Sequence, residues 1–552
     1  MSLLADNIEA SLYDPLPDLQ SIRCIVILPG IGSEIVSCQL DVISLGESYS
    51  FQALSYVWGN PNPPQYIECD GILKSVTPNL LAALRSLRSE TEVRWMWIDA
   101  LCINQLDLAE RSQQVLLMRR IYTEADGVIV YLGDDDNGQA AIALDLIKKA
   151  SDHHVKDMAQ NSGFSLHLGE TEAKDFPPLV KDNPAWNAVS WFLDLPWFGR
   201  VWVLQEVAFQ EATMMIGKSE IEWRDVAKAI VWLQAKSCLR NSCDRWRSER
   251  LISIEIAATP NIGLFEILAT SADFEASDPR DHVYALLGLA KNSDTIMSSP
   301  LLRPDYTKTL KQVNSSLVRY FLQNSGDGQA NLDILSLVTS RGSDPDVVED
   351  LPSWAPRFHG KFFGNTRLAQ GQISETWRAS KCLAVQLLES EDENSLILQG
   401  LKITRIISSD HSFESVYCDS GLRLLNAVKE LLEKKVKPFE FKCADTAEES
   451  LAQTLTAGWP RSGVDKVWVH NEDNLTDPYH AADLEDYLFG PQSASPPEFS
   501  PFTNAMHCGG GEAIFLTESG HIGIGAKELQ VGDFIFFGGM LCAWFDVWVG
   551  DR

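Results

Sequence analysis

The stretch WMWIDALCINQLDLAERSQQVLLMRRIYTEADGVIVYL, residues 95–132, decides the fold of the N-terminal part of this chain. Its apolar start at 95–99 is typical of a short strand, and the run GVIVYL at 127–132 is typical of a strand buried on both faces. Between them, Asp107 with Glu110 three residues later predicts a helix that begins with a capping box. A strand, a helix and a strand at this spacing predict a right-handed parallel crossover.

The residues upstream of this stretch extend the predicted sheet. Apolar runs at 22–28 and 51–57 are typical of two further strands. The Asp-Gly pair at 70–71, flanked by short apolar runs, predicts a hairpin with a tight primed turn. The Thr-Pro pair at 77–78 predicts the capped start of a helix.

The sequence downstream of residue 220 is first helical and then mixed. Helical patterns are found at 224–235, 247–257, 279–290, 307–323 and 420–437, and short strand patterns near 396–400, 513–517 and 533–537. We therefore predict an α/β fold with an N-terminal parallel-type sheet and flanking helices, followed by a helical region and a mixed α+β C-terminal region. The expected domains are 1–220, 221–345 and 346–552.

Composition excludes several classes of protein. The 46 basic and 76 acidic residues give a net charge of −30, which argues against a partner rich in phosphate, such as a nucleic acid. The eleven cysteines form no Cys-x-x-Cys pair, so we expect reduced thiols, no metal site and a cytoplasmic protein. The first twenty residues contain neither a basic segment nor an apolar run, so we expect no secretory leader. The apolar run at 534–550 is too short for a membrane span and is interpreted as a buried strand.

Polar and aromatic residues follow two of the predicted strands. Trp58 and Gly59 come after the strand at 51–57, and Asp99, Asn104 and Gln105 after the next parallel strand. Ligands of open α/β sheets collect at such carboxyl ends, so these residues are candidates for a binding site. Each also has a structural interpretation, because the aspartate can bind amides of its own loop and the Trp-Gly pair can form a turn with a packed indole.

The segment PWFGRVWVLQE at 196–206 contains the best single candidate for a functional group. In a helix, Trp202, Glu206 and Phe209 project from one face, which predicts a carboxylate between two aromatic rings. Burial would raise the pKa of this carboxylate, and a perturbed carboxylate is a candidate site residue. The alternative is a structural ion paired with Arg200, Arg120 or a backbone amide.

At these segments the sequence resembles the heterokaryon-incompatibility (HET) domain of filamentous fungi. The matching pieces are 53–59 (ALSYVWG), 97–105 (WIDALCINQ), 110–115 (ERSQQV), 118–125 (MRRIYTEA) and 200–206 (RVWVLQE). Together they cover a domain core of about 50–210. Pieces at 278–288, 351–356, 520–523 and 532–533 look like segments that follow this domain in many members. The ending at 540–552 departs from the longer tail usual in the family, so we expect a truncated C-terminus.

The resemblance implies a role in fungal self/non-self recognition, namely heterokaryon incompatibility or programmed cell death. The family's proposed distant kinship to Toll/interleukin-1 receptor (TIR) domains, some of which cleave NAD, implies a TIR-like fold and NAD glycohydrolase activity. In enzymatic TIR domains a Trp precedes the catalytic Glu by four residues, as Trp202 precedes Glu206 here. Glu206 is then the catalytic residue and NAD a substrate, not a resident cofactor. The implied substrate-binding residues are Trp58, Gly59, Asp99, Asn104, Gln105, Arg200 and Trp202.

Two alternatives stay open at this point. In the first, the domain is a non-enzymatic interaction module that acts by self-association or by binding a protein partner of the incompatibility system. In the second, the chain is an enzyme that acts on a different small molecule, for example in secondary metabolism.

Overall fold

The computed structural model describes residues 12–324 apart from 136, 160–173, 179–182, 237, 240–241 and 272. It also describes 332–337, 351–358 without 353, 386–410 without 389, 391, 393 and 400, then 513–518, 522–525, and 531–537 without 533. The chain divides into two compact units, 1–309 and 310–552. The division into 1–220, 221–345 and 346–552 stays a prediction.

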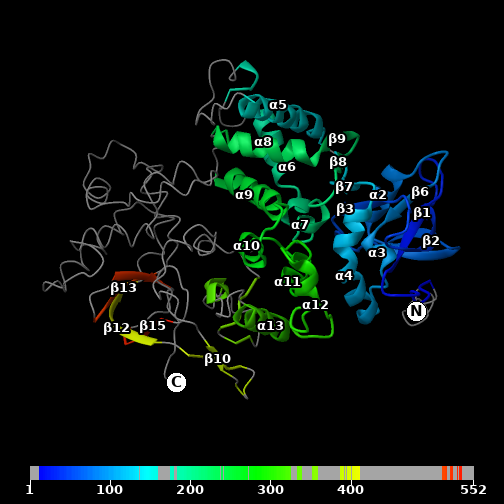
Figure 1. The fold of residues 1–552 in the computed structure, drawn as a ribbon. Coiled ribbons are helices and arrows are strands. Elements are labelled where there is room, and N and C mark those ends of the chain that lie inside the picture. Colours follow the sequence, from blue (N-terminus) through cyan, green and yellow to red (C-terminus); the bar gives the residue numbers. More distant parts are fainter. Residues whose placement is uncertain are drawn as a thin grey trace. The chain divides into compact units, whose positions relative to one another are not determined.

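The first unit is built on a nine-stranded mixed sheet with the order β5-β4-β2-β1-β6-β3-β7-β8-β9 (Figure 1). Its strands are β1 (Ser21–Ile27), β2 (Ser37–Ser44), β3 (Gln52–Tyr56), β4 (Gln65–Cys69), β5 (Ile72–Val76), β6 (Arg94–Trp97), β7 (Val128–Tyr131), β8 (Ala212–Ile216) and β9 (Ser219–Glu222). The four strands β6, β3, β7 and β8 run parallel to one another, and β1 pairs antiparallel with β6. The predicted α/β fold with a parallel-type sheet is confirmed.

Strand β3 is the point at which the strand order reverses. The chain passes from β3 to β6 on one side of it and then crosses to β7 on the other side. In open α/β sheets, ligands bind outside the carboxyl ends of the strands at such a point. The carboxyl ends of β3 and β6 are therefore the place where a ligand site is expected.

Local sequence signals explain the edges of this sheet. Strands β4 and β5 pair around Asp70 and Gly71, whose φ angles of 49° and 76° are both left-handed, as the predicted primed turn requires. Helix α2 (Pro78–Leu87) begins at Thr77, whose hydroxyl oxygen accepts a hydrogen bond from the Leu80 amide at 3.2 Å. Both sequence predictions are confirmed.

Helix α4 (Leu108–Glu124) begins as predicted, because the Asp107 carboxylate accepts hydrogen bonds from two first-turn amides at 2.9 and 3.1 Å. The predicted capping box is incomplete, since Glu110 does not return to the amide of Asp107. The Glu110 carboxylate accepts instead from the buried Arg23 guanidinium at 2.6 and 3.1 Å and from the Asn104 amide at 2.7 Å. Glu110 therefore joins α4 to β1 and to the loop after β6.

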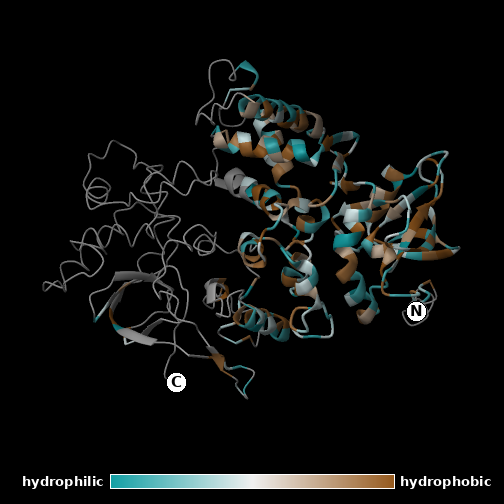
Figure 2. Ribbon diagram, in the orientation of Figure 1, coloured by the Kyte–Doolittle hydropathy of each residue, from teal (hydrophilic) through white to brown (hydrophobic). Residues whose placement is uncertain are grey.

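Helices complete the first unit. They are α3 (Asp99–Cys102), α5 (Ala140–Ala159), α6 (Pro184–Leu193), α7 (Val203–Glu206), α8 (Trp223–Ala235), α9 (Ser242–Ala257), α10 (Leu264–Thr270), α11 (Asp281–Leu287) and α12 (Ser293–Ser298). Helices α5 and α8 pack along each other. In Figure 2 the apolar colour follows the central strands, and the helices mix apolar and polar residues. The helices predicted near 224–235, 247–257 and 279–290 are confirmed.

The second unit contains α13 (Leu310–Gln323), where a helix is predicted, and two small sheets. Their strands are β10 (Gln386–Leu388) and β11 (Ile397–Gln399), then β12 (Leu401–Asp410), β13 (Ala513–Thr517), β14 (Ile522–Gly525) and β15 (Phe534–Phe537). The predicted helix at 420–437 and residues 538–550 of the predicted last strand lie outside the described residues. Within the described part of the chain, no helix is long and apolar enough to cross a membrane.

The buried pair of Arg23 and Glu110 gives a prediction about stability. Removing one partner of a buried pair leaves the other charge uncompensated, so Arg23→Met should lower the free energy of unfolding by about 3 kcal/mol. The matched control is Arg120→Met, which removes an exposed i,i+4 pair with Glu124 on the same helix and should cost under about 1 kcal/mol. Urea denaturation of both variants checks the order, and equal losses would contradict it.

Candidate functional site

The segment that carries Glu206 is bent and is not one continuous helix. A 3-10 turn, η2 (Pro196–Gly199), is followed by Arg200 and then by the single turn of α7. Between them the chain pairs with Glu275, whose carbonyl accepts from the Val201 amide at 2.9 Å. The predicted helical face holds only for Trp202 and Glu206, since the Glu206 amide donates to the Trp202 carbonyl at 3.1 Å, but the helix ends before Phe209.

The Glu206 carboxyl lies against the carboxyl end of β3. Its side chain is 3% exposed, and Oε2 accepts a hydrogen bond from the Ser55 hydroxyl. The Ser55 oxygen accepts in turn from the indole N–H of the fully buried Trp197 at 2.7 Å. Because an indole nitrogen can only donate, the single proton of Ser55 is left for Glu206. The chain Trp197–Ser55–Glu206 therefore has a fixed direction and presents a donor to the carboxylate.

Arg200 is the charged partner of Glu206. Its Nη2 lies 3.6 Å from Glu206 Oε1, and its Nη1 donates to the carbonyl of Tyr56. The Arg200 side chain is 20% exposed, so the guanidinium borders both the interior and solvent. Arg120, the other arginine considered from the sequence, pairs with Glu124.

Asp99 follows β6 and lies within electrostatic reach of the Arg200 guanidinium. Its Oδ2 accepts from the indole N–H of Trp58 at 3.0 Å, and its Oδ1 from the Ala100 amide at 2.7 Å. Asp99 therefore binds an amide of its own loop, as its structural interpretation predicts. Trp58 is 41% exposed, so its ring is open to solvent although its nitrogen is held.

Burial and charge act in opposite directions on this cluster. Burial raises the pKa of Glu206, and the Arg200 charge and the Ser55 hydrogen bond oppose that rise. Burial also raises the pKa of Asp99, again against the Arg200 charge. Burial disfavours the Arg200 cation, but the two carboxylates outweigh it and the pKa of Arg200 is raised. The charge of one guanidinium thus acts on two carboxyl groups, of which only Glu206 forms an ion pair with it.

Three other predicted residues shape the surrounding loops. The Gln105 side-chain amide donates to the Asp99 carbonyl at 3.0 Å, and Asn104 Oδ1 accepts from the Leu106 amide at 3.3 Å. Gly59 has a left-handed φ of 72° in the turn after β3. These residues support the loops of the cluster through backbone contacts.

Trp202 is directed to another group of residues. Its indole N–H donates to Asp281 Oδ2 at 3.0 Å, while Asp281 Oδ1 accepts from the Tyr306 hydroxyl at 2.6 Å. Arg111 lies 3.8 Å from the same carboxyl, and its guanidinium stacks 3.6 Å above the Tyr306 ring. Burial raises the pKa of Asp281 to about 6, against the hydrogen bonds from Tyr306 and Trp202. The predicted Trp–Glu pair is therefore split between two sites.

Sequence analysis missed Ser55, Trp197, Tyr56 and Tyr122, which all take part in or border the cluster. A signal was present for Ser55 alone, since it is the polar residue inside the apolar run ALSYV at 53–57. The tyrosines were indistinguishable from core residues.

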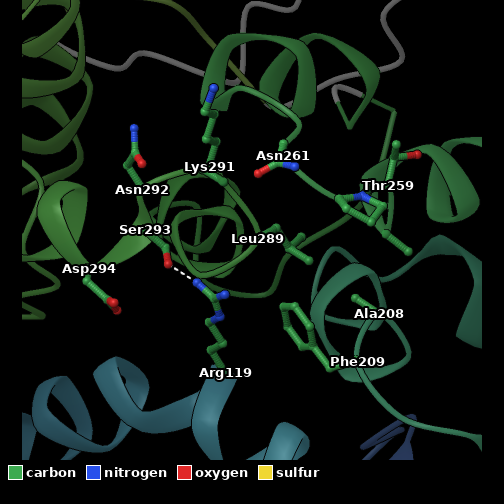
Figure 3. Close-up of a pocket in the computed structure, with 14 residues that line it drawn as sticks. Arg119, Ala208, Phe209, Thr259, Asn261, Leu289, Lys291, Asn292, Ser293 and Asp294 are labelled. Atoms are coloured by element: carbon green, nitrogen blue, oxygen red, sulfur yellow. Dashed lines mark hydrogen bonds between the residues drawn. The ribbon is translucent and has the colours of Figure 1, made fainter.

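A cavity of about 470 Å³ lies elsewhere in the first unit, and none of the predicted site residues lines it (Figure 3). Figure 3 places Arg119 and Phe209 at the bottom, Asn261 at the top and Leu289 between them. The Arg119 guanidinium donates to the Ser293 hydroxyl and lies 5.4 Å from the Phe209 ring centroid, so it is already engaged. We base the functional site on the carboxylate cluster because its ionisable groups and strand ends converge there.

Comparisons with known proteins identify relatives of the chain. Residues 51–206 match the family model described as heterokaryon incompatibility protein (HET), a segment that ends at Glu206. The chain is 28% identical over 370 residues to heterokaryon incompatibility protein 6, OR allele, of Neurospora crassa. That match covers 56% of this chain and 54% of the relative, so the chain spans about half the length of the curated relative. No solved structure matches the chain.

Asp281 gives a prediction about pH. Its folded pKa of about 6 lies above the usual range of an aspartate, so its stabilising contribution is complete below about pH 4 and is lost as pH rises through 6. The shift corresponds to roughly 3 kcal/mol. Asp281→Asn cannot titrate, so its stability deficit relative to wild type should shrink from pH 4 to pH 6, measured by urea denaturation.

Asp278→Asn is the matched control. Burial raises the pKa of Asp278, but the hydrogen bonds from Arg280 outweigh it and the net pKa is lowered. The deficit of this variant should therefore not shrink over the same range. Parallel pH curves for Asp281→Asn and wild type would refute the assignment of the titrating group.

Proposed function

We propose that the protein, whose residues 51–206 match the HET family model, is a cytoplasmic component of fungal heterokaryon incompatibility that promotes cell death. The incompatibility role is supported by the 28% identity to a Neurospora crassa protein of that printed name. Self-association and a protein partner of the incompatibility system belong to this proposal.

The chemical step we propose is hydrolysis of NAD at Glu206, by distant analogy with enzymatic TIR domains. The observation that carries it is the position of the Glu206 carboxyl. It is buried at the carboxyl end of β3, where the strand order reverses, beside Arg200 and a second carboxyl group. A buried carboxyl group with a raised pKa at the ligand edge of an α/β sheet is an arrangement suited to catalysis.

The reaction balances without a cofactor. The glycosidic bond between the ribose carbon and the pyridinium nitrogen breaks, its electron pair stays on nitrogen, and neutral nicotinamide leaves, so no general acid is required. An oxygen of water bonds to the ribose carbon, and its proton passes to the Glu206 carboxylate or to solvent. The negative charge stabilises the oxocarbenium-like transition state in a site with restricted water.

The remaining residues have separate roles in this proposal. The exposed ring of Trp58 stacks on the substrate, and Asp99 and Arg200 orient its polar groups. Gly59, Asn104 and Gln105 hold the loops at the site. Trp202 positions α7, and with it Glu206, through its hydrogen bond to Asp281.

Purified wild-type protein should consume NAD across a concentration series, with a crowding agent to promote assembly. Glu206→Gln should lose about 10³-fold in rate, because the amide keeps the shape and removes the negative charge that the transition state needs. Nicotinamide release, measured by chromatography, checks both.

The control is Glu124→Gln, a change of a partly exposed side chain on α4 outside the cluster, which should keep full activity. Retained NAD cleavage in Glu206→Gln would remove Glu206 from the mechanism. An inactive wild-type protein at every concentration would favour the interaction module or another small-molecule substrate.

Trp58 gives a second prediction for this reaction. Its side chain is 41% exposed, so Trp58→Ala should fold normally but lose the stacking surface, raising KM for NAD about tenfold with little change in melting temperature. Tyr66→Ala is a control with a similarly exposed ring, 54% exposed, on β4 away from the cluster. An unchanged KM in Trp58→Ala would exclude stacking.

A further inference from the structure

Two buried tyrosines near the carboxylate cluster differ from the other buried tyrosines of the first unit. Tyr56, the last residue of β3, is 2% exposed, and Tyr122 of α4 is 1% exposed. Within the described residues neither phenol hydroxyl forms a hydrogen bond. The hydroxyls of Tyr131, Tyr284 and Tyr306 are bonded to Asp134, the Asp305 carbonyl and Asp281 at 3.0, 3.0 and 2.6 Å.

Neither phenol oxygen is fully enclosed, so each reaches space that water or a ligand can occupy. They lie beside the cluster. The Tyr56 carbonyl accepts from Arg200, and the charges of Asp99, Arg200 and Glu206 act on both phenols. Tyr122 packs edge-on against Trp97, the last residue of β6, with ring centroids 5.6 Å apart. Both side chains therefore border the ends of the strands that carry the site.

The charges of the cluster restrict what could satisfy these hydroxyls. Asp99 and Glu206 together oppose the single cation Arg200, which disfavours an anionic group such as a phosphate. Burial, followed by the carboxylate charges, raises the pKa of both phenols well above 10, so each keeps its proton and can donate as well as accept. An alcohol is the complementary partner, because it is neutral and can also both donate and accept a hydrogen bond.

We propose that the hydroxyls of Tyr56 and Tyr122 bind hydroxyl groups of a sugar ring held over the Glu206 site. This inference rests on the proposed function and names the part of the substrate that the site recognises, the ribose attached to nicotinamide. The ligand enters where the cluster is open, past the exposed ring of Trp58 and the half-buried Asp99 and Arg200. A buried water molecule that bridges the phenols is the competing explanation.

Kinetics of Tyr56→Phe and Tyr122→Phe distinguish the two explanations. Each variant keeps the ring and removes one hydroxyl, so each should raise KM for NAD about tenfold if the hydroxyl contacts the substrate. Tyr284→Phe is the matched control, because it removes a hydroxyl that is bonded to a backbone carbonyl outside the cluster, and KM should not change. If the hydroxyls bind a structural water instead, both test variants should change the melting temperature and leave KM unchanged. That result would overturn the inference.

A second measurement combines the Phe variants with altered substrates. Wild-type protein is assayed with NAD analogues that lack one hydroxyl of the nicotinamide ribose, and the loss is compared with that of the Phe variants. Removing a ribose hydroxyl that a phenol binds should raise KM about tenfold with the wild-type protein and raise it little further with the matching Phe variant. Additive losses in every combination contradict the contact.

The outcomes separate this inference from the proposed function. NAD cleavage that depends on Glu206 but is indifferent to both phenols overturns the inference alone. Wild-type protein that neither binds NAD in calorimetry nor consumes it overturns both.

Discussion

The burial of the Glu206 carboxyl group is the constraint on which the candidate site depends. A carboxylate that is 3% exposed requires compensation, which comes from the Ser55 hydroxyl and the Arg200 guanidinium. Ser55 belongs to β3 and Arg200 to the segment before α7, so the same contacts that stabilise the charge also fasten that segment to the sheet. The buried indole of Trp197 fixes the direction of the hydrogen bonds. Local stability and the orientation of the carboxylate thus have one physical origin.

Helix α7 has a single turn, and an isolated turn of helix is unstable in water. It is held on one side by Glu206 and on the other by the Trp202 indole on Asp281. Asp281, Tyr306 and Glu275 lie beyond the matched segment 51–206, yet they position its last residues. The geometry of the site therefore depends on residues 275–306, and a fragment that stops at 206 lacks these contacts.

Sequence reasoning succeeded where the physical signal is local. The Asp-Gly turn at 70–71, the caps at Thr77 and Asp107 and the apolar strands each follow from short patterns. The carboxyl-end rule singled out the loops after β3 and β6, which meet where the Trp58 indole donates to Asp99. It failed where contacts between distant residues decide the outcome. Glu110 bonds to Arg23 instead of its own cap, and the chain bends after Gly199 to pair with Glu275. A helical period assumes that the helix continues, so a face that extends from Trp202 through Glu206 to Phe209 was predicted although the helix ends at Glu206.

A raised carboxyl pKa is common to structural pairs and catalytic groups, and charge balance helps to separate them. A structural pair of Glu206 with Arg200 would be complete by itself. Here the charge of Arg200 also acts on a second carboxyl group, Asp99. The Asp99 carboxylate accepts a hydrogen bond from the indole of Trp58, whose side chain is 41% exposed. Burying a second carboxyl group at this place costs folding free energy. Such local cost is usual where a protein keeps a site ready for a ligand, because the ligand supplies the missing partners when it binds.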